Sequence, residues 1–197
     1  TLMEKIFELE SEADQFEDHL GQYLVKLSSK DHSVKDSAAL SMLFHCIGDM
    51  ERISDHAVNI AESAEEMHQK NLAFSAEGAR EIATFADAVR EILRLSLESF
   101  IKEDMDEAVL VEPLEEVVDD LRDELKKRHV NRLREGKCTI ELGFVLSDLT
   151  TNFERVADHC SNIAACLIQT GEHDFEMHKY IHKLAKGENT PFHERYM

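Results

Sequence analysis

The chain of 197 residues carries a formal net charge of −19, which repels nucleic acid backbones and anionic membrane surfaces and favours cations as partners. Its hydrophobic share of 43%, its two prolines and seven glycines, and the absence of tryptophan are typical of a globular protein built from long helices. Because no alternating apolar and polar run supports a β-strand, we predict an all-α fold and no nucleic acid partner.

Apolar residues recur every three or four positions along most of the chain, which is the spacing of amphipathic helices. This pattern predicts helices over residues 2–27, 34–69, 76–103, 106–134 and 140–170. Pro113 either kinks the fourth helix or starts its regular part, because proline has no amide hydrogen for the preceding turn. Beyond Gly171 the pattern weakens, and we expect a short helix over 174–186 followed by an irregular tail.

Hydroxyl and carboxylate side chains lie where three of the helices should begin. Ser33, Asp36 or Ser37 can cap the second helix. Ser75 and Thr139 lie before the third and the fifth. Such side chains accept hydrogen bonds from the free amides of the first helical turn, so they predict where these helices start.

The four cysteines form no C-x-x-C pair, and three of them, Cys46, Cys160 and Cys166, occupy helical positions where a small apolar side chain would serve. We interpret them as reduced core thiols in a cytoplasmic compartment. The longest nearly apolar run, residues 38–47, is far shorter than the roughly 20 residues that span a bilayer. No signal peptide opens the sequence, and we expect no direct insertion into a membrane.

A ten-residue segment occurs twice in the chain. Residues 51–60 (ERISDHAVNI) return as residues 154–163 (ERVADHCSNI), with six of the ten positions identical. In each copy a glutamate and an aspartate four residues apart share one helix face. The preceding helices also align, residues 9–14 with 114–119, at an offset of 105 instead of 103. The chain therefore contains an internal duplication.

The duplication predicts two tandem antiparallel helical bundles. The first repeat covers residues 1–72 and the second covers 73–172, with a short helix and tail over 173–197. The second repeat contains a helix, 76–103, that has no counterpart at the start of the chain. We therefore expect the first bundle to lack its first helix, and the fold to continue upstream or to take another segment in that place.

Hairpin geometry should bring the repeated carboxylates of neighbouring helices together in two acidic patches. The first acidic patch consists of Glu10, Asp14, Glu51 and Asp55, and the second acidic patch consists of Glu115, Asp119, Glu154 and Asp158. Four converging carboxylates repel one another unless cations lie between them. Oxygen ligands suit hard or borderline ions, so we predict that both patches bind divalent or ferric metal ions (iron, zinc, magnesium, manganese or calcium).

Polar residues beside the patches have alternative roles. His56 and His159 can serve as extra nitrogen ligands or as hydrogen-bonding residues around the site. Arg52 and Arg155 can form ion pairs that hold a carboxylate in place. The alternative for the patches themselves is a solvated acidic helix face, because charged side chains usually stay exposed.

No motif of a nucleophilic enzyme occurs in the sequence, which contains no G-x-S-x-G, no glycine-rich phosphate loop and no H-E-x-x-H. A ferritin-like di-iron oxidase needs two Glu-x-x-His motifs on partner helices, and only Glu65 with His68 provides one. We therefore expect a protein that is not an enzyme. A carboxylate-bridged di-iron enzyme and a purely structural helical adaptor are the alternatives.

The repeated motif resembles the signature of the PhoU family of phosphate-signalling proteins, commonly E-R-I-x-D-x-A-x-N-I. Residues 51–60 and 154–163 match it, the acidic pairs of the preceding helices match as well, and the likeness spans residues 7–172. The resemblance implies two similar three-helix bundles with metal ions on the repeated motifs. It also implies negative regulation of phosphate uptake, through contact with transport components at the inner face of the membrane.

The missing first helix and the C-terminal tail resemble the cytoplasmic PhoU-like region of bacterial sodium/phosphate cotransporters. This resemblance implies a cytoplasmic regulatory module that is tethered to the inner membrane through its parent transporter. The expected partner is the membrane portion of that transporter, in the same polypeptide, and a homodimer is a further option. The expected mechanism is conformational, with metal or partner binding fixing the relative tilt of the two bundles.

Overall fold

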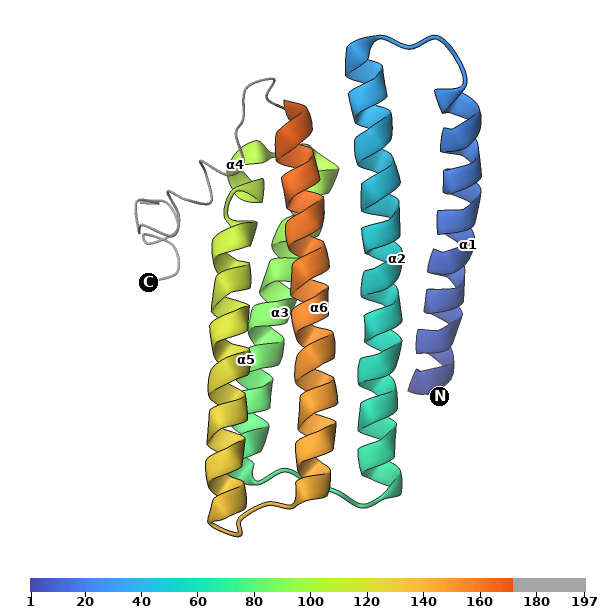
Figure 1. Ribbon diagram of the computed structural model, residues 1–197. Helices are drawn as coiled ribbons and strands as arrows, with labels where there is room; N and C mark the ends of the chain where they lie inside the picture. The colour runs from blue at the N-terminus through green and yellow to red at the C-terminus, as the bar shows by residue number, and fades with distance from the viewer. Residues whose placement is uncertain (172–197) are drawn as a thin grey trace.

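The fold consists of long helices that run side by side along one axis (Figure 1). The computed structural model describes residues 1–171, which form α1 (Leu2–Ser28), α2 (Val34–Gln69), α3 (Ala76–Lys102), α4 (Met105–Ala108), α5 (Val111–Arg134) and α6 (Ile140–Gly171). These residues contain no strand, so the predicted all-α class is confirmed. No helix among them has an apolar stretch long enough to cross a bilayer. The short helix expected over 174–186 lies outside the described residues.

Side-chain caps start three of the helices where the sequence predicts them. At the start of α2 the Ser33 hydroxyl accepts a hydrogen bond from the amide of Asp36 (3.2 Å), and the Asp36 carboxylate accepts one from the amide of Ser33 (3.3 Å). The hydroxyls of Ser75 and Thr139 accept hydrogen bonds from first-turn amides of α3 and α6. Because a cap of this kind stabilises a helix by about 1 kcal/mol, local sequence is sufficient to set these starts.

The helix predicted over 106–134 is two helices, α4 and α5, so that prediction is wrong at its N-terminal end. The Asp104 carboxylate caps α4 by accepting a hydrogen bond from a first-turn amide at 3.1 Å. The chain then turns, because Ala108 and Val111 are buried in the core and anchor the connection between the two helices. Pro113 lies in the first turn of α5, where its missing amide hydrogen leaves no helix hydrogen bond unmade.

The hydrophobic core lies where α3, α4, α5 and α6 meet. Phe85 of α3 meets Phe153 of α6 edge to face, with ring centroids 5.5 Å apart. Burial of one such side chain stabilises the fold by about 1.5–3 kcal/mol, so this bundle provides a large share of the stability. Other core side chains of the bundle are Val89, Ile92 and Leu95 of α3, Val111 and Val118 of α5, and Leu146 and Val156 of α6.

The cysteines take the core positions expected of small apolar side chains. Cys46 and Cys160 are fully buried, Cys166 is half-buried, and none of the four cysteines forms a disulfide bond. Burial raises the pKa of the Cys160 thiol to about 12. This thiol is therefore protonated and unreactive at neutral pH.

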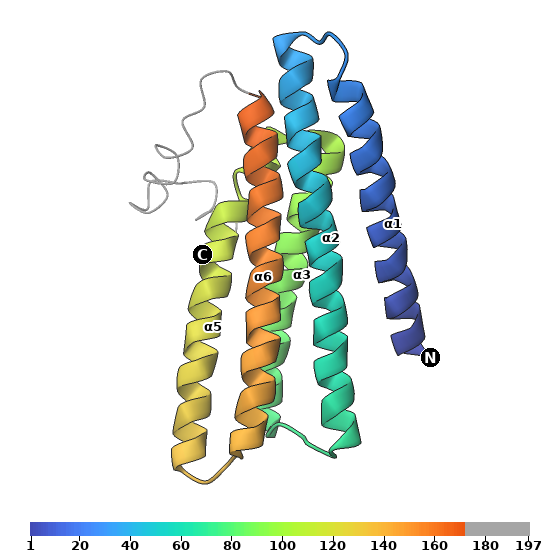
Figure 2. The same cartoon turned by 45° about the vertical axis from the view of Figure 1, so that its right-hand side comes forward.

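The two repeats differ in how much of their apolar surface is covered. Hairpin α1–α2 corresponds to hairpin α5–α6, but only the second carries α3 (Figure 2). Leu114 and Leu125 on α5 are 5% and 3% exposed. Their counterparts on α1, Leu9 and Leu20, are 53% and 44% exposed, and Leu24 is the one buried residue of α1. In the described part of the chain, the first bundle thus lacks the helix that corresponds to α3, as predicted.

The two repeats are joined along α2 and α6, which lie side by side in both views (Figures 1 and 2). The domain boundary that we predict between residues 72 and 73 falls in the short connection from α2 to α3. The division into domains stays a prediction. What matters for the site is that both copies of the repeated motif lie on this central pair of helices.

Candidate metal centres on two acidic patches

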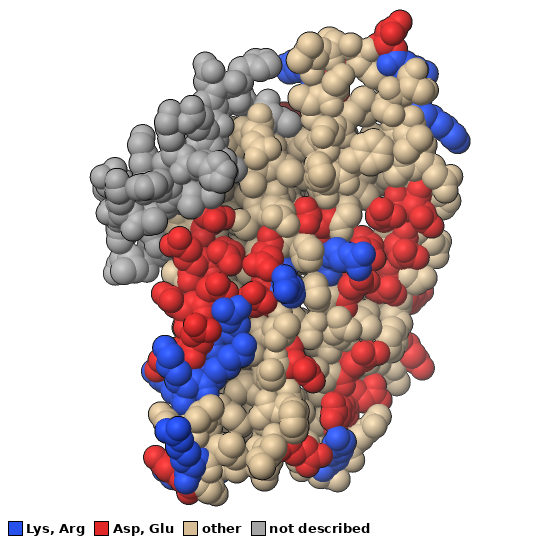
Figure 3. All heavy atoms as spheres, viewed as in Figure 1, with Lys and Arg blue, Asp and Glu red and all other residues tan. Residues whose placement is uncertain are grey.

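Carboxylate side chains gather at middle height on one face of the molecule, in one group over α5 and another over α1 (Figure 3). The repeated motifs lie on the neighbouring helices, α2 and α6. Each acidic patch therefore combines a pair of carboxylates on an outer helix with a pair on the central helix beside it. The two patches differ in their contacts.

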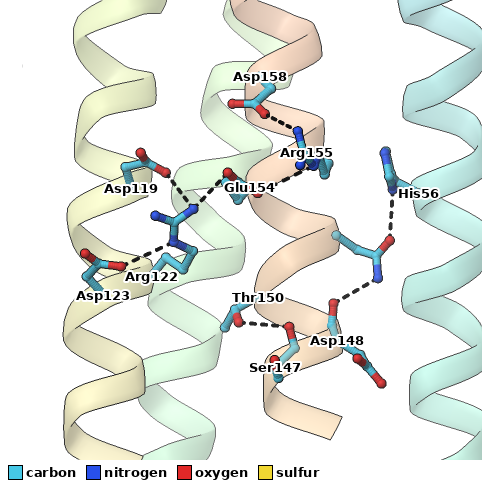
Figure 4. A network of polar contacts seen from close by, with 11 residues as sticks. His56, Asp119, Arg122, Asp123, Ser147, Asp148, Thr150, Glu154, Arg155 and Asp158 are labelled. Atoms are coloured by element: carbon cyan, nitrogen blue, oxygen red, sulfur yellow. Dashed lines mark hydrogen bonds and ion pairs between the residues drawn. The ribbon is translucent and has the colours of Figure 1, made fainter. Parts of the chain in front are cut away.

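In the second acidic patch an arginine lies between the carboxylates of α5 and α6 (Figure 4). One terminal nitrogen of Arg122 is 2.8 Å from Glu154 Oε1 and 3.2 Å from Asp119 Oδ1. Its Nε lies 3.4 Å from the Asp123 carboxylate. The side chains of Arg122 and Glu154 are only 21% and 17% exposed, so solvent screens this pair less than a surface pair.

Arg122 was not among the predicted site residues. The signal that could have identified it is its spacing, since it follows Asp119 by three residues on the same helix and can pair with it. Its contact with Glu154 joins α5 to α6, so it can be predicted only when the alignment of these two helices in the hairpin is known. Despite the ion pair, Asp119 Oδ1 is buried and has no hydrogen-bond partner among the residues that the structure describes.

At the end of the second acidic patch away from Arg122, Glu115 is surrounded by negative charges. Burial raises the pKa of Glu115 to about 7, and the negative charges of Asp119, Glu112 and Asp158 add to this effect. Asp158 pairs with Arg155 at 3.2 Å, as predicted for that arginine. Glu115 therefore holds a proton on a large fraction of molecules at neutral pH, which relieves the repulsion that a bound cation would otherwise relieve.

In the first acidic patch, the arginine that pairs with the carboxylates of α2 lies at the surface. Arg52 lies 3.2 Å from Asp55 Oδ2 and 3.5 Å from Glu51 Oε2, but its side chain is 61% exposed. Burial and then the charge of Asp55 raise the pKa of Glu51, whereas Arg52 lowers it. The Glu51 carboxylate is 20% exposed and close to a second negative charge, and within residues 1–171 the arginine paired with it lies at the surface.

Helix α1 adds one further carboxylate to the first acidic patch. Glu17, which was not predicted as a site residue, adds to the charges that raise the pKa of Glu51. The predicted residues Glu10 and Asp14 lie on the same helix, Glu10 half-buried and Asp14 exposed. Glu17 and Glu51 also line an open cavity of about 640 Å³ between α1, α2 and α6.

The donor chemistry of both patches fits a hard cation, because each offers carboxylate oxygens that repel one another when no cation is near. Within residues 1–171, no three His, Cys, Asp or Glu side chains are arranged to hold a metal ion as they lie. Binding would therefore need carboxylates of neighbouring helices to turn toward a shared ion. The metal sites and the identity of the metal stay predictions.

The two repeated histidines form hydrogen bonds across the α2–α6 interface. His56 Nδ1 lies 2.8 Å from Asn152 Oδ1, and His159 Nδ1 lies 2.8 Å from Asp49 Oδ1. The two rings stack with centroids 5.6 Å apart, and Asn162 donates a further hydrogen bond to Asp49 (3.2 Å). Of the two predicted roles, the structure favours hydrogen bonding over metal ligation. Asp49 and Asn152 occupy equivalent positions in the two repeats, which the sequence alignment could have shown.

The single Glu-x-x-His motif does not form a buried ligand pair. Glu65 and His68 are both exposed near the C-terminal end of α2, and Glu65 accepts a hydrogen bond from the neighbouring Gln69 side chain (3.2 Å). No observation on these residues favours a di-iron enzyme.

The sequence is similar to those of known proteins. The family model described as "PhoU domain" matches residues 1–64 and 82–167. A "Phosphate-specific transport system accessory protein PhoU homolog 1" of Thermotoga maritima is 23% identical over 190 residues, covering 95% of this chain and 81% of that protein. A "Phosphate-specific transport system accessory protein PhoU homolog" of Synechocystis is 30% identical over 161 residues, covering 81% of this chain and 70% of that protein.

Solved structures show the same fold. PhoU from Pseudomonas aeruginosa superposes with a TM-score of 0.80 at 22% identity, covering 86% of this chain and 81% of that one. The phosphate transport system regulatory protein PhoU from Streptococcus pneumoniae superposes with a TM-score of 0.76 at 18% identity, covering 88% and 81%. At these identities the likeness establishes the architecture of the helices and leaves the chemistry of the patches to the residues themselves.

Proposed function

The chain belongs to the PhoU family, and from this premise we propose that it is a regulatory module of phosphate transport that acts by binding and not by catalysis. The observation that carries the proposal is the match of the PhoU domain to both repeats, together with relatives described as accessory proteins of phosphate-specific transport. The acidic motifs that define the repeat lie on the two central helices. Binding of a ligand at either motif can therefore alter the packing of α2 against α6, where the two repeats meet.

We propose that the carboxylates of the two acidic patches hold divalent or ferric cations. Support comes from the half-buried Glu51 and Glu115, whose pKa values are raised by burial and by neighbouring carboxylates. A bound cation would offset the repulsion between these carboxylates. It would also link the outer helix of each hairpin to the central helix. The proposed ligands come from Glu10, Asp14, Glu51 and Asp55 in the first patch and from Glu115, Asp119, Glu154 and Asp158 in the second.

We further propose that the partner is the membrane portion of a sodium/phosphate cotransporter, at the cytoplasmic face of the membrane and in the same polypeptide. The uncovered apolar face of α1, with Leu9 and Leu20 about half exposed, supports a protein partner. A net charge of −19 disfavours contact with anionic lipid, so we expect this chain to bind the protein part of the transporter and not the lipid. A second copy of this chain is the alternative occupant of that face.

Phosphate uptake by cells tests the proposal. In cells that lack this chain, we expect uptake to stay high when phosphate is plentiful, and expression of the wild-type chain should reduce it. Glu51→Gln combined with Asp55→Asn should fail to reduce uptake, because the first patch loses the charge that holds a cation. The control is Glu62→Gln, an exposed glutamate on the same helix, which should act like the wild type.

The proposal fails at different points for different results. Unchanged uptake after loss of the chain would contradict a role in phosphate transport. Full repression by the Glu51→Gln, Asp55→Asn variant would leave the regulatory role intact and remove the first patch from the mechanism.

A further inference from the structure

The two acidic patches carry opposite charges at one equivalent position. The alignment that pairs residues 9–14 with 114–119 continues to pair Glu17 with Arg122, at the same offset of 105. The arginines of the repeated motif, Arg52 and Arg155, are equivalent and occupy the same place in both patches. The difference between the patches therefore lies mainly in Glu17 against Arg122.

Arg122 makes the contacts that a bound cation would make. It reaches the Glu154 carboxylate at 2.8 Å and the Asp119 carboxylate at 3.2 Å, and so links α5 to α6. Its side chain is 21% exposed and lies between the two helices (Figure 4). A guanidinium in this position is a permanent positive charge, because arginine stays protonated in proteins.

Glu17 has the reverse effect in the first patch. It lines the same cavity as Glu51, the residue equivalent to Glu154, and so places a further negative charge beside that carboxylate. Arg52, which lies 3.5 Å from the Glu51 carboxylate, is 61% exposed and is matched by Arg155, 56% exposed, in the other patch. The first patch thus has a carboxylate, Glu17, at the position where the second has an internal cation, Arg122.

We propose that Arg122 is a built-in counter-cation that lowers the affinity of the second acidic patch for metal ions, so that the first patch is the tighter site. The proposal rests on the proposed metal binding and assigns it unequally to the two repeats. A positive charge within about 4 Å of the ligands weakens the binding of a second cation by at least about tenfold. The second patch is then held together without metal, whereas the first gains its cross-link only when an ion is present.

Reciprocal charge changes test the proposal in the described chain, with Mn²⁺ alone as the probe. Arg122→Gln removes the internal cation from the second patch, and Glu17→Arg introduces one into the first. The matched control is Arg128→Gln, also on α5, where Arg128 pairs with Glu124 and Glu81 outside both patches. Bound Mn²⁺ is counted by electron paramagnetic resonance after removal of metal with a chelator, and the melting temperature is measured with and without Mn²⁺.

We expect the wild type to show one class of tight Mn²⁺ sites. Arg122→Gln should gain a second tight class, with at least about tenfold higher affinity than the second patch of the wild type and a larger rise in melting temperature on addition of Mn²⁺. Glu17→Arg should lose the tight class, and Arg128→Gln should bind like the wild type. If Arg122→Gln does not fold without metal but folds with Mn²⁺, the result also supports the proposal.

The remaining results separate this proposal from the proposed function. If the wild type binds Mn²⁺ tightly and neither exchange alters binding, the role of Arg122 is overturned and metal binding stands. If the wild type binds none and Arg122→Gln does, the counter-cation role stands and the metal site of the first patch fails. Absence of binding in all variants overturns both. If Arg122→Gln is unfolded under every condition, unchanged binding by Glu17→Arg overturns the proposal and loss of binding supports it.

Discussion

Among single residues, Glu115 shows most directly how negative charge accumulates at one end of the second acidic patch. Burial, followed by the charges of Asp119 and Glu112, raises the pKa of its carboxyl from 4.5 to about 7. Between these two pH values the folded protein binds more protons at this site than the unfolded chain does. The stability that Glu115 contributes is therefore complete below pH 4.5 and is lost as the pH rises through 7.

The pH dependence of unfolding tests this behaviour. For metal-free protein, we expect Glu115 to lower the free energy of unfolding by roughly 1–2 kcal/mol between pH 4.5 and 8, a value reduced from the full shift because the site is only half-buried. Glu115→Gln should remove that loss and should be more stable than the wild type at pH 8. Urea denaturation at both pH values in a chelating buffer measures it. The control is Asp120→Asn, an exposed carboxylate on the same helix. The same pH dependence in wild type and Glu115→Gln would show that the Glu115 carboxyl is solvated.

At the scale of the helices, local sequence predicts what short-range contacts determine. The starts of α2, α3 and α6 follow from Ser33, Ser75 and Thr139, because capping involves only the next few residues. The break between α4 and α5 could not be predicted in this way. It depends on burial of Ala108 and Val111 among helices that are distant in sequence.

The same distinction applies to the candidate site. The carboxylates of the patches were visible in the sequence because they repeat at a fixed spacing on a helix face. Arg122 was not, because its role depends on the register between α5 and α6, which places it beside Glu154. The hydrogen bond from His159 to Asp49 likewise joins helices of different repeats, so neither residue identifies its partner from local sequence.

A pair of equivalent leucines tests the unequal cover of α1 and α5. Leu125→Ala should lower the free energy of unfolding by about 2–5 kcal/mol, because it leaves a cavity beneath α3. Leu20→Ala, at the equivalent position on α1, should cost less than about 1 kcal/mol because that side chain is 44% exposed. Chemical denaturation of both variants measures the difference. Equal losses would mean that the α1 face is covered in solution and that the two hairpins are packed alike.

For the whole molecule, the two repeats are alike in fold and unequal in packing and charge. The second repeat has the additional helix α3, a buried core and an internal cation at Arg122. The first has an uncovered apolar face on α1 and an acidic patch with Glu17 in place of that cation. They meet along α2 and α6, where His56 and His159 stack. We infer that the second repeat is the stable frame and that the first responds to ions and partners.

The location of bound metal tests this account most directly. Crystals of the protein soaked in Mn²⁺ can be measured by anomalous X-ray diffraction at the manganese edge, which places each ion without reference to the protein atoms. We predict the strongest anomalous peak beside Glu51 and Asp55, in the first acidic patch, and a weaker peak or none between Asp119 and Glu154, where Arg122 lies. An equal or stronger peak in the second patch, or no peak in either patch, would contradict the account.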